Sequence, residues 1–304
     1  MRTASTGIVY ELVKKDKRVL ALCADGGNDV YQMIRKDFPQ QYIDYGIAEE
    51  NMVASAAGLA SCDKIPFVFG TTNFIAMRAF EFIRNDVALP NHNVKFLGIS
   101  SGLSKTNWGA THHGIEELAL LRCLPNLLVI TPATPIEARE ATKFAYRHKG
   151  AVYIRLEASN ETEYYDENYV FQLGKGYVIN KGDDFTIITM GGILSEAMQI
   201  AEGLVSCGLT IRVINMPMVK PVDEEIILSA AQETKGIITL EEHSIYGGLG
   251  SAVAEVLTEN GISTKFARMG LHGCAIGCGN RDEIRELNGI GENDVKKKLR
   301  EMLG

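Results

Sequence analysis

Short apolar runs rich in β-branched residues alternate with longer amphipathic runs along nearly the whole chain. The runs that predict strands cover residues 18–23, 66–70, 94–100, 127–131, 151–156, 185–190, 210–215 and 236–241. The runs that predict helices cover residues 30–37, 48–61, 76–88, 115–122, 135–148, 194–206, 224–232, 251–260 and 292–303. This alternation is typical of parallel sheets joined by crossover helices. Because several strand runs are apolar on both faces, we expect an α/β fold with helices covering both sides of each sheet.

The length of 304 residues is sufficient for two domains of about 150 residues each. A polar segment at residues 157–168, rich in Ser, Asn, Glu and Asp, interrupts the alternation and is the best candidate for a linker. We therefore predict one domain at residues 1–165 and a second at residues 166–304.

Net charge and the lengths of the apolar runs indicate which classes of binding partner are disfavoured. The formal net charge is −7, which does not favour a nucleic-acid-binding surface. The sequence contains no apolar run as long as the roughly 18 residues of a membrane span, and it lacks a secretion signal. We therefore expect a cytoplasmic protein with neither a nucleic-acid nor a membrane partner.

The six cysteines lie mostly within apolar segments, which predicts reduced thiols in the core. Cys274 and Cys278 are the only pair close enough in sequence to indicate a metal or redox site. Two cysteines without further clustered ligands do not complete a tetrahedral zinc set, so we predict no metal bound by this chain and leave the role of the pair open.

Two adjacent acids, Glu49 and Glu50, stand where an Ala-rich helical pattern begins, just after Gly46. Acids at a helix start are usually solvated and favoured by the helix dipole. Here the preceding segment is rich in apolar and aromatic residues: Tyr42, Ile43, Tyr45 and Ile47. One of the two acids could therefore be buried among apolar side chains. A buried carboxyl group has a raised pKa and is suited to sharing a proton with a ring nitrogen.

Several blocks, in the same order, resemble the carboxyl-terminal half of transketolase, and most closely the separate carboxyl-terminal subunit of split transketolases. The blocks are residues 18–29 with an Ala-Asp turn, 46–52 with the paired acids, 74–85, Gly109-Ala-Thr-His112-His113, 125–132, and Glu241-Glu242-His243 with Gly247-Gly248-Leu249-Gly250-Ser251. The resemblance spans nearly the whole chain. It implies a pyrimidine-binding domain for thiamine diphosphate with a parallel sheet, followed by a transketolase C-terminal-like α/β domain.

The resemblance implies specific roles at the cofactor. Glu49 matches the acid that contacts the aminopyrimidine of thiamine diphosphate, at a hydrogen-bond distance of about 2.6–3.2 Å. Glu50 is the alternative in a shifted register. Phe74 matches the aromatic residue that stacks on the pyrimidine in split transketolases, and Ile75 takes that place if the register differs by one residue.

The resemblance also implies a set of substrate-binding residues. His112 matches the histidine that bonds substrate hydroxyls near the reacting carbon, and His113 follows it. Arg155 matches the arginine that binds the distal phosphate of the sugar, although a salt bridge at a strand end is an equal alternative. Trp108 stands where most transketolases have a substrate-binding aspartate, and Ser100 or Ser101 replaces a family histidine. We expect Trp108 to wall a pocket for a shorter or altered sugar.

The family segment that holds the diphosphate and Mg²⁺, Gly-Asp-Gly followed by Asn, has no match in this chain. Gly182-Asp183-Asp184 lacks the second glycine. Oxygen-rich ligands of the missing kind suit magnesium. The resemblance therefore implies an N-terminal transketolase subunit as partner, which carries that motif and most of the magnesium contacts. We expect a dimer of heterodimers, in which His243 and the turn at residues 247–250 support dimer contacts.

The resemblance thus implies a transferase that is active only with its partner and moves a two-carbon ketol unit between sugar (phosphate) donors and aldehyde acceptors. One alternative is a transketolase-like enzyme for a modified sugar, either a sulfosugar or a branched sugar phosphate. Others are a 1-deoxyxylulose-5-phosphate synthase-like protein, a 2-oxoacid dehydrogenase β-subunit-like protein, and a non-catalytic homologue. The sequence does not identify the donor and acceptor sugars.

Overall fold

The computed structural model describes residues 1–24, 29–157, 161–275 and 277–304. Most of the predicted Ala-Asp turn (residues 25–28) and part of the predicted linker (158–160) lie outside the described residues. Packing of Cα atoms divides the chain into two compact units. The first consists of Met1–Ser101 and Leu120–Phe171, and the second of Gly102–Ala119 and Gln172–Gly304. The boundary after residue 165 stays a prediction, because the two units interleave along the chain.

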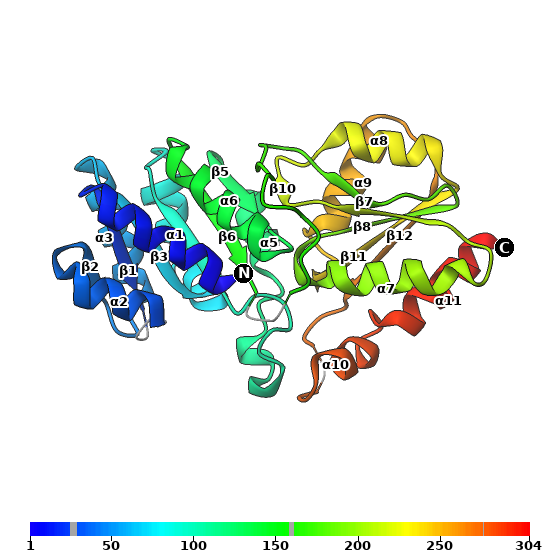
Figure 1. Cartoon of the computed structure of the whole chain (residues 1–304), viewed down its shortest axis with the longest axis horizontal. Helices are drawn as coiled ribbons and strands as arrows, with labels where there is room; N and C mark the ends of the chain where they lie inside the picture. The colour runs from blue at the N-terminus through cyan, green and yellow to red at the C-terminus, as the bar shows by residue number, and fades with distance from the viewer. Residues whose placement is uncertain (25–28, 158–160, 276) are drawn as a thin grey trace. The chain divides into compact units, whose positions relative to one another are not determined.

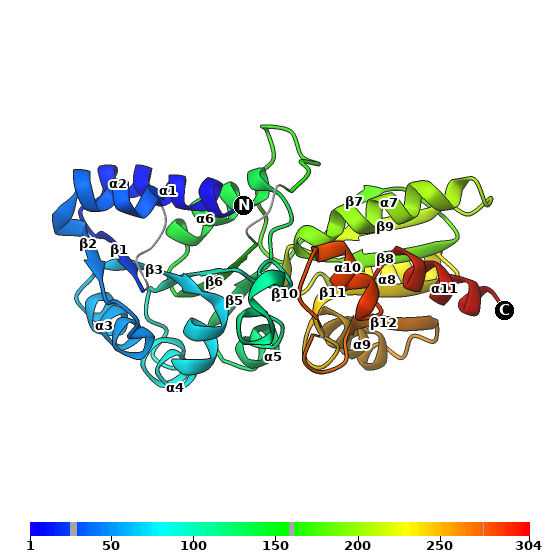
Figure 2. The same cartoon turned by 90° about the horizontal axis from the view of Figure 1, so that it is seen from below.

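The strands of the first unit form a parallel sheet in the order β5-β6-β4-β3-β1-β2 (Figure 1). The strands are β1 (Val19–Cys23), β2 (Tyr42–Asp44), β3 (Ile65–Thr71), β4 (Lys95–Ile99), β5 (Leu127–Ile130) and β6 (Ala151–Leu156). The helices are α1 (Arg2–Lys15), α2 (Asp29–Asp37), α3 (Glu49–Ser61), α4 (Phe80–Phe82) and α6 (Pro135–Arg147). Figure 2 shows α1, α2 and α6 on one face of this sheet and α3 and α4 on the other. Every residue of β1 and β6 is buried, as expected for strands covered on both faces.

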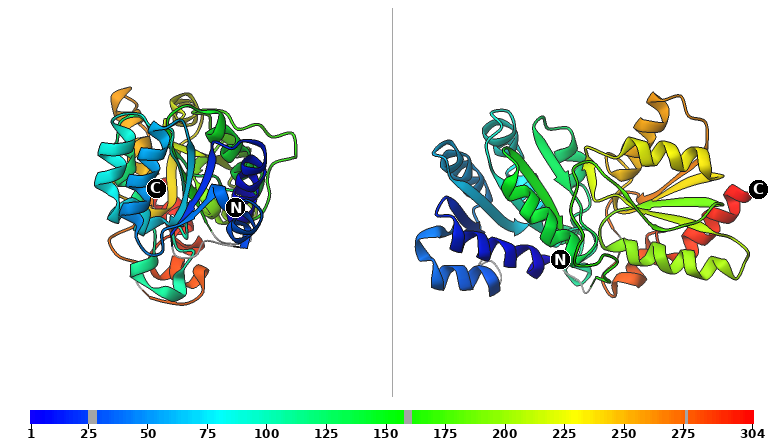
Figure 3. Two further views of the ribbon diagram at one scale, coloured as in Figure 1. Left: turned by 90° about the vertical axis from the view of Figure 1, so that its left-hand side faces the viewer. Right: turned by 45° about the horizontal axis from the view of Figure 1, so that its top comes forward.

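The second unit has a sheet in the order β12-β11-β8-β9-β7, parallel except that the edge strand β7 runs antiparallel to β9. The strands of this sheet are β7 (Tyr177–Asn180), β8 (Phe185–Thr189), β9 (Ile211–Asn215), β11 (Gly236–Ser244) and β12 (Lys265–Leu271). The short strand β10 (Met218–Lys220) is not part of it. Its helices are α7 (Leu194–Val205), α8 (Glu224–Glu233), α9 (Leu249–Glu259), α10 (Arg281–Leu287) and α11 (Glu292–Leu303). Figures 1 and 3 show α8 and α9 on one face of this sheet and α7 and α11 on the other.

Local sequence signals account for several helix starts. Thr134 caps α6 by accepting a hydrogen bond from the Glu137 backbone N–H at 3.2 Å, and Pro135 occupies the first helical position. Asp223 caps α8 in the same way, by accepting a hydrogen bond from the Ile226 backbone N–H at 3.2 Å. The predicted α/β class is confirmed. The sequence did not predict α1, α10 or the short and edge strands β2, β7, β10 and β12. No helix in the described parts of the chain is long and apolar enough to cross a membrane.

Candidate active-site residues

Glu49 is the first residue of α3 and follows a tight turn at Gly46. The Asp44 carboxylate accepts a hydrogen bond from the Gly46 backbone N–H at 2.9 Å, and Gly46 has a φ of +61°, which glycine adopts without strain. Glu49 is only 2% exposed, whereas its neighbour Glu50 is half-buried. As an acid in the first turn of α3, Glu49 lies near the positive end of the helix dipole. The structure therefore places one buried acid, Glu49, where the sequence pattern put two candidates.

Glu49 is held by one side chain. Its Oε2 accepts a hydrogen bond from Nη1 of Arg78 at 2.7 Å. The Arg78 guanidinium also lies 5.3 Å from the ring centroid of Phe74, a cation–π distance. Within the described residues, Glu49 Oε1 accepts no hydrogen bond. One oxygen of this buried carboxylate is thus fixed, and the other is left as an acceptor for a ligand.

Phe74 and Ile75 lie on a π-helical turn, Phe74–Arg78, which is followed after α4 by a second π-helical turn, Ile83–Ala88. Wider turns of this kind are frequent at functional sites because they redirect side chains. Phe74 is partly exposed, whereas Ile75 is fully buried and lies 3.1 Å from the place where a Cβ on Gly70 would stand. Of the two, only the Phe74 ring retains surface that a ligand can reach.

Ser100 follows β4 directly and has an unusual backbone. Its φ is +62°, a region that non-glycine residues rarely adopt, and its Oγ is buried without a hydrogen-bond partner among the described residues. Its neighbour Ser101 bonds Thr72 Oγ1 at 2.8 Å. Strained backbone and unpaired polar groups gather at functional sites. The sequence signalled this position only as a replaced family histidine.

Arg155 is at the end of β6 and only 1% exposed. Its Nη1 lies 3.7 Å from Oε1 of Glu157, which is also buried. The strand-end ion pair considered from the sequence is therefore present. A role for the same guanidinium in binding a phosphate stays a prediction.

In the second unit, Trp108 and His112 lie side by side on adjoining 3₁₀ turns, Thr106–Trp108 and Ala110–His112. Their ring centroids are 4.7 Å apart in an edge-on arrangement, and Lys105 Nζ lies 4.3 Å from the Trp108 ring centroid. Trp108 is 54% exposed. His112 Nδ1 is 2.9 Å from Thr111 Oγ1. An aromatic platform, a cation and a histidine therefore share one exposed loop.

His113, in contrast to His112, is buried, with only 1% of its surface exposed. Burial lowers the pKa of His113, although its backbone hydrogen bond with Thr106 and the charge of Glu242 act in the opposite direction. The imidazole of His113 is therefore shielded from solvent, whereas that of His112 is partly exposed. The two histidines, adjacent in sequence, thus have different environments.

The block Glu241-Glu242-His243 in β11 is buried and makes contacts within the second unit. Glu241 accepts hydrogen bonds from the backbone N–H groups of Leu249 and Gly250 at 2.8 Å each, and so caps α9. His243 has no exposed surface, and its Nε2 accepts a hydrogen bond from the Leu118 N–H at 3.2 Å. The His243 side chain is enclosed in its own unit and therefore cannot contact a second subunit directly. Support of dimer contacts by the turn at residues 247–250 stays a prediction.

The prediction of core thiols is also wrong for most cysteines. Cys23 is buried, but the other cysteines are exposed and unpaired: Cys62, Cys123, Cys207, Cys274 and Cys278. Among the residues that the structure describes, no group of three or more His, Cys, Asp or Glu side chains is arranged to hold a metal ion.

The segment Gly182-Asp183-Asp184, which lacks the second glycine of the diphosphate motif, makes contacts within the second unit. The Asp184 carboxylate binds Lys235 Nζ at 2.7 Å and the Thr210 N–H at 2.8 Å.

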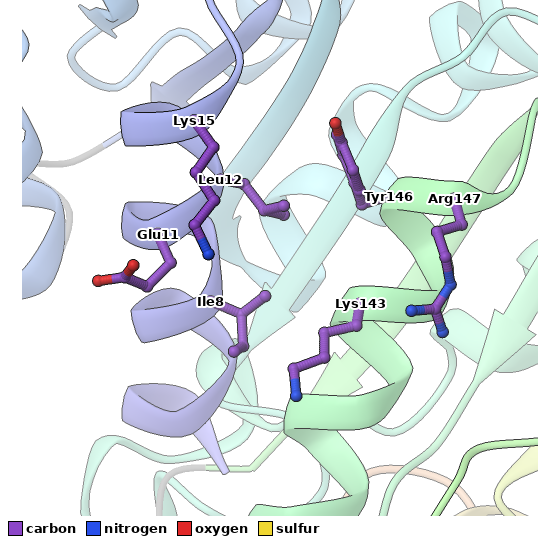
Figure 4. A pocket seen from close by; sticks show the side chains of 7 residues that line it. All are labelled: Ile8, Glu11, Leu12, Lys15, Lys143, Tyr146 and Arg147. Carbon is purple, nitrogen blue, oxygen red and sulfur yellow. The ribbon is translucent and has the colours of Figure 1, made fainter.

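A groove of about 430 Å³ lies between α1 and α6 in the first unit (Figure 4). Its lining is Ile8, Glu11, Leu12, Lys15, Lys143, Tyr146 and Arg147. None of the candidate active-site residues contributes to it, so it is separate from the site predicted from the sequence.

Comparison with known proteins assigns both halves of the chain. The profile of the transketolase pyrimidine-binding domain matches residues 1–162, and that of the transketolase C-terminal domain matches residues 174–295. A transketolase C-terminal section from Methanocaldococcus jannaschii is 36% identical over 306 residues, covering 99% of this chain and 96% of that protein.

Two further relatives carry names with a stated sugar. A subunit of an apulose-4-phosphate transketolase from Phocaeicola vulgatus is 34% identical and covers 99% of this chain and 97% of that protein. A 6-deoxy-6-sulfo-D-fructose transketolase subunit from a Clostridium species is 34% identical and covers 99% and 94%. Among solved structures, a split-gene transketolase described as an inactive β4 tetramer superimposes with a TM-score of 0.89 at 35% identity, covering 99% of this chain and 97% of that one.

Proposed function

The chain belongs to the transketolase family, and we propose that it is the carboxyl-terminal subunit of a two-chain transketolase that moves a two-carbon ketol unit from a sugar donor to an aldehyde acceptor. The observation that carries this proposal is the buried Glu49 carboxylate at the start of α3, with one oxygen fixed by Arg78 and the other available. Nearly full-length matches to a transketolase C-terminal section and to the B subunit of another transketolase support it.

The residues present fit the pyrimidine end of thiamine diphosphate. When bound, this cofactor supplies the electron sink for breaking and forming the carbon–carbon bond. Glu49 Oε1 is a desolvated acceptor suited to holding a proton at a ring nitrogen, while Arg78 keeps the carboxylate from rotating away. The exposed part of Phe74 offers a face for stacking, worth about 0.5–1.5 kcal/mol beyond burial. Ile75 would support that ring from the core.

We assign substrate binding to His112 and Trp108, with His113 and Arg155 in supporting positions. His112 is partly exposed, and its ring nitrogens can donate to or accept from a sugar hydroxyl. Trp108 provides a flat apolar surface against the sugar carbons, and Lys105 adds a positive charge above the same ring. Arg155 has the planar fork that suits an oxyanion, provided that it exchanges Glu157 for the substrate.

A modified sugar is the favoured substrate within this proposal. Trp108 replaces an acid in the loop, so a hydroxyl bonded by that acid in ordinary transketolases has no carboxylate partner here. The Lys105–Trp108 pair instead suits a sugar with an anionic group and an altered carbon skeleton. The names of two relatives, one for apulose 4-phosphate and one for 6-deoxy-6-sulfo-D-fructose, point to the same chemical class.

The second chain of the enzyme completes this proposal. An N-terminal transketolase subunit with a Gly-Asp-Gly…Asn motif would bind the diphosphate and Mg²⁺, since carboxylate and amide oxygens are suitable magnesium ligands. We propose that two such heterodimers associate into a heterotetramer in the cytoplasm. The likeness to a solved β4 assembly supports self-association of this subunit.

The test is reconstitution of the two chains. The purified chain is mixed with the N-terminal transketolase subunit encoded beside it, thiamine diphosphate and Mg²⁺, and assayed against a panel of ketose phosphates and sulfonates. Ketol transfer by the mixture, with negligible transfer by either chain alone, is the expected result. Full activity of this chain alone, or none with the partner and any ketose, would contradict the proposal.

A further inference from the structure

The loop that carries Trp108 and His112 is joined to the rest of the second unit by a narrow neck. Gly102 and Gly114 pair in an antiparallel bridge, with N–H to O distances of 2.7 and 3.1 Å. The exposed turns between them form the tip of the loop. The position of the tip therefore depends on what holds this neck.

Consecutive residues of β11 hold the neck. Glu242 Oε2 accepts a hydrogen bond from the Leu103 N–H at 3.0 Å. The Ser244 N–H donates to the Ile115 carbonyl oxygen at 2.7 Å, which fixes the return strand of the neck. His243 Nε2 accepts from the Leu118 N–H, just after it.

Both ring nitrogens of His243 have fixed roles. Because Nε2 accepts the Leu118 N–H, the proton of a neutral ring is on Nδ1, where it is donated to the Ser244 carbonyl oxygen at 2.8 Å. A histidine bonded in this way is suited to orienting backbone rather than to moving a proton.

Glu242 is itself held by α10. The buried carboxylate receives Nε of Arg281 at 2.8 Å, Nη2 of Arg281 at 2.5 Å and Nε of Arg285 at 2.7 Å. Burial alone would raise the pKa of Glu242, but the two guanidinium groups outweigh it and hold that pKa well below its usual range. Such bidentate, charge-assisted bonds fix an acceptor oxygen in direction as well as in charge.

At Gly102 the backbone of the neck lies so close to Glu242 that no side chain would fit between them. Gly102 has a φ of +60°, and a Cβ on it would stand 2.5 Å from Glu242 Oε2. The contact between the neck and the Glu242 carboxylate therefore requires glycine at position 102, where the backbone can come close to the carboxylate.

We propose that Glu242 and His243 are positioning residues that set the orientation of the Trp108–His112 loop, and that Arg281 and Arg285 of α10 act on the same loop through Glu242. This inference rests on the proposed function for its catalytic consequence, since the loop matters there as the substrate-binding element. Its structural content, that α10 holds the loop through Glu242, does not depend on the reaction.

Trp108 allows a direct test, because it is the only tryptophan in the chain. Fluorescence anisotropy and acrylamide quenching of the full-length protein then report on the loop tip alone. For Glu242→Gln and the milder Arg281→Gln, we expect lower anisotropy and quenching closer to that of the urea-unfolded chain. The matched control is Asp223→Asn, a buried acid of the same unit that bonds the backbone N–H groups of Ile226 and Gly176 instead of the neck. It should leave both Trp108 signals at the wild-type value.

The second readout uses the reconstituted two-chain enzyme. Arg281→Gln should lower kcat/KM by about 10- to 100-fold through misplacement of the loop, with the larger share in KM for the ketose and little change in half-saturation by thiamine diphosphate. Arg281→Lys should restore part of the loss. Unchanged Trp108 signals in both Glu242→Gln and Arg281→Gln, or equal changes in the Asp223→Asn control, would overturn the inference. An inactive wild-type pair whose variants still change Trp108 would instead contradict the proposed function alone.

Discussion

Arg78 Nη1 lies 2.7 Å from Glu49 Oε2, and it joins a partly exposed guanidinium to a carboxylate that is almost fully buried. A carboxylate enclosed by protein is costly unless it is paired, and Arg78 supplies that partner for Glu49. Because the pair uses one carboxylate oxygen, the other keeps a fixed direction.

The first prediction concerns Glu49. Glu49→Gln should lower ketol transfer by the two-chain enzyme about 10²–10⁴-fold, the usual contribution of a positioned acid or base. Thermal unfolding should show that the chain still folds, since the amide can keep a hydrogen bond from Arg78. Glu50→Gln, at the next position of α3, is the control and should retain most activity. Wild-type rates for Glu49→Gln would remove this residue from the mechanism.

The second prediction concerns substrate choice. Trp108→Ala removes the platform beside His112 and below Lys105, so the ranking of ketoses by kcat/KM should change. We expect the largest loss, about 1–3 kcal/mol or roughly 5- to 150-fold, for the donor that the wild-type enzyme prefers. Steady-state kinetics on a donor panel measures the change. A uniform loss across all donors would show that Trp108 does not select the sugar.

The third prediction is a pH dependence of stability. Lys95 in β4 is fully buried, and its Nζ donates to the carbonyl oxygens of Gly150 at 2.5 Å and His148 at 2.9 Å. Burial lowers the pKa of this amine from 10.5 to about 7. Between these values the unfolded chain binds the proton and the folded chain does not, so stability should rise with pH in that window. Below about pH 7 both states are protonated, and the cost of burial is fully present.

The slope in that window should not exceed about 1.4 kcal/mol per pH unit. Urea denaturation from pH 7 to pH 10 measures it. Lys95→Met should flatten the profile, whereas Lys36→Met, at an exposed lysine, should not. A wild-type profile that is flat or falls across this range would disprove the assignment to Lys95.

The fourth prediction concerns Gly98, the next-to-last residue of β4. A Cβ there would stand 2.3 Å from Tyr153 Oη and 2.8 Å from Thr72 Oγ1. Gly98→Ala should therefore cost about 1–3 kcal/mol by overpacking. The double variant Gly98→Ala/Tyr153→Phe, which removes the nearest atom, should be less destabilised than the sum of its single variants. Strict additivity in urea denaturation would indicate that Tyr153 is not the obstacle.

The sequence predicted the sheet-and-helix alternation because buried parallel strands and amphipathic helices have strong periodic patterns. It did not predict α1, whose exposed and buried residues give little contrast, or the edge strands β2 and β7, which are short and only half-buried. It located Glu49 because a family motif marked it, and the choice over Glu50 required the burial of each side chain. It could not find the Arg78 pair or the Glu242–Leu103 bond, since residues so far apart in sequence leave no local pattern.

The chain enters the second unit at Gly102, returns to the first at Leu120, and leaves it again after Phe171. No single cut can thus yield two intact fragments, and a protein ending near residue 171 would display an orphaned loop. During synthesis on the ribosome, the loop emerges more than a hundred residues before β11, which must receive it. During synthesis, this loop can therefore reach its final conformation only late, after β11 has also emerged.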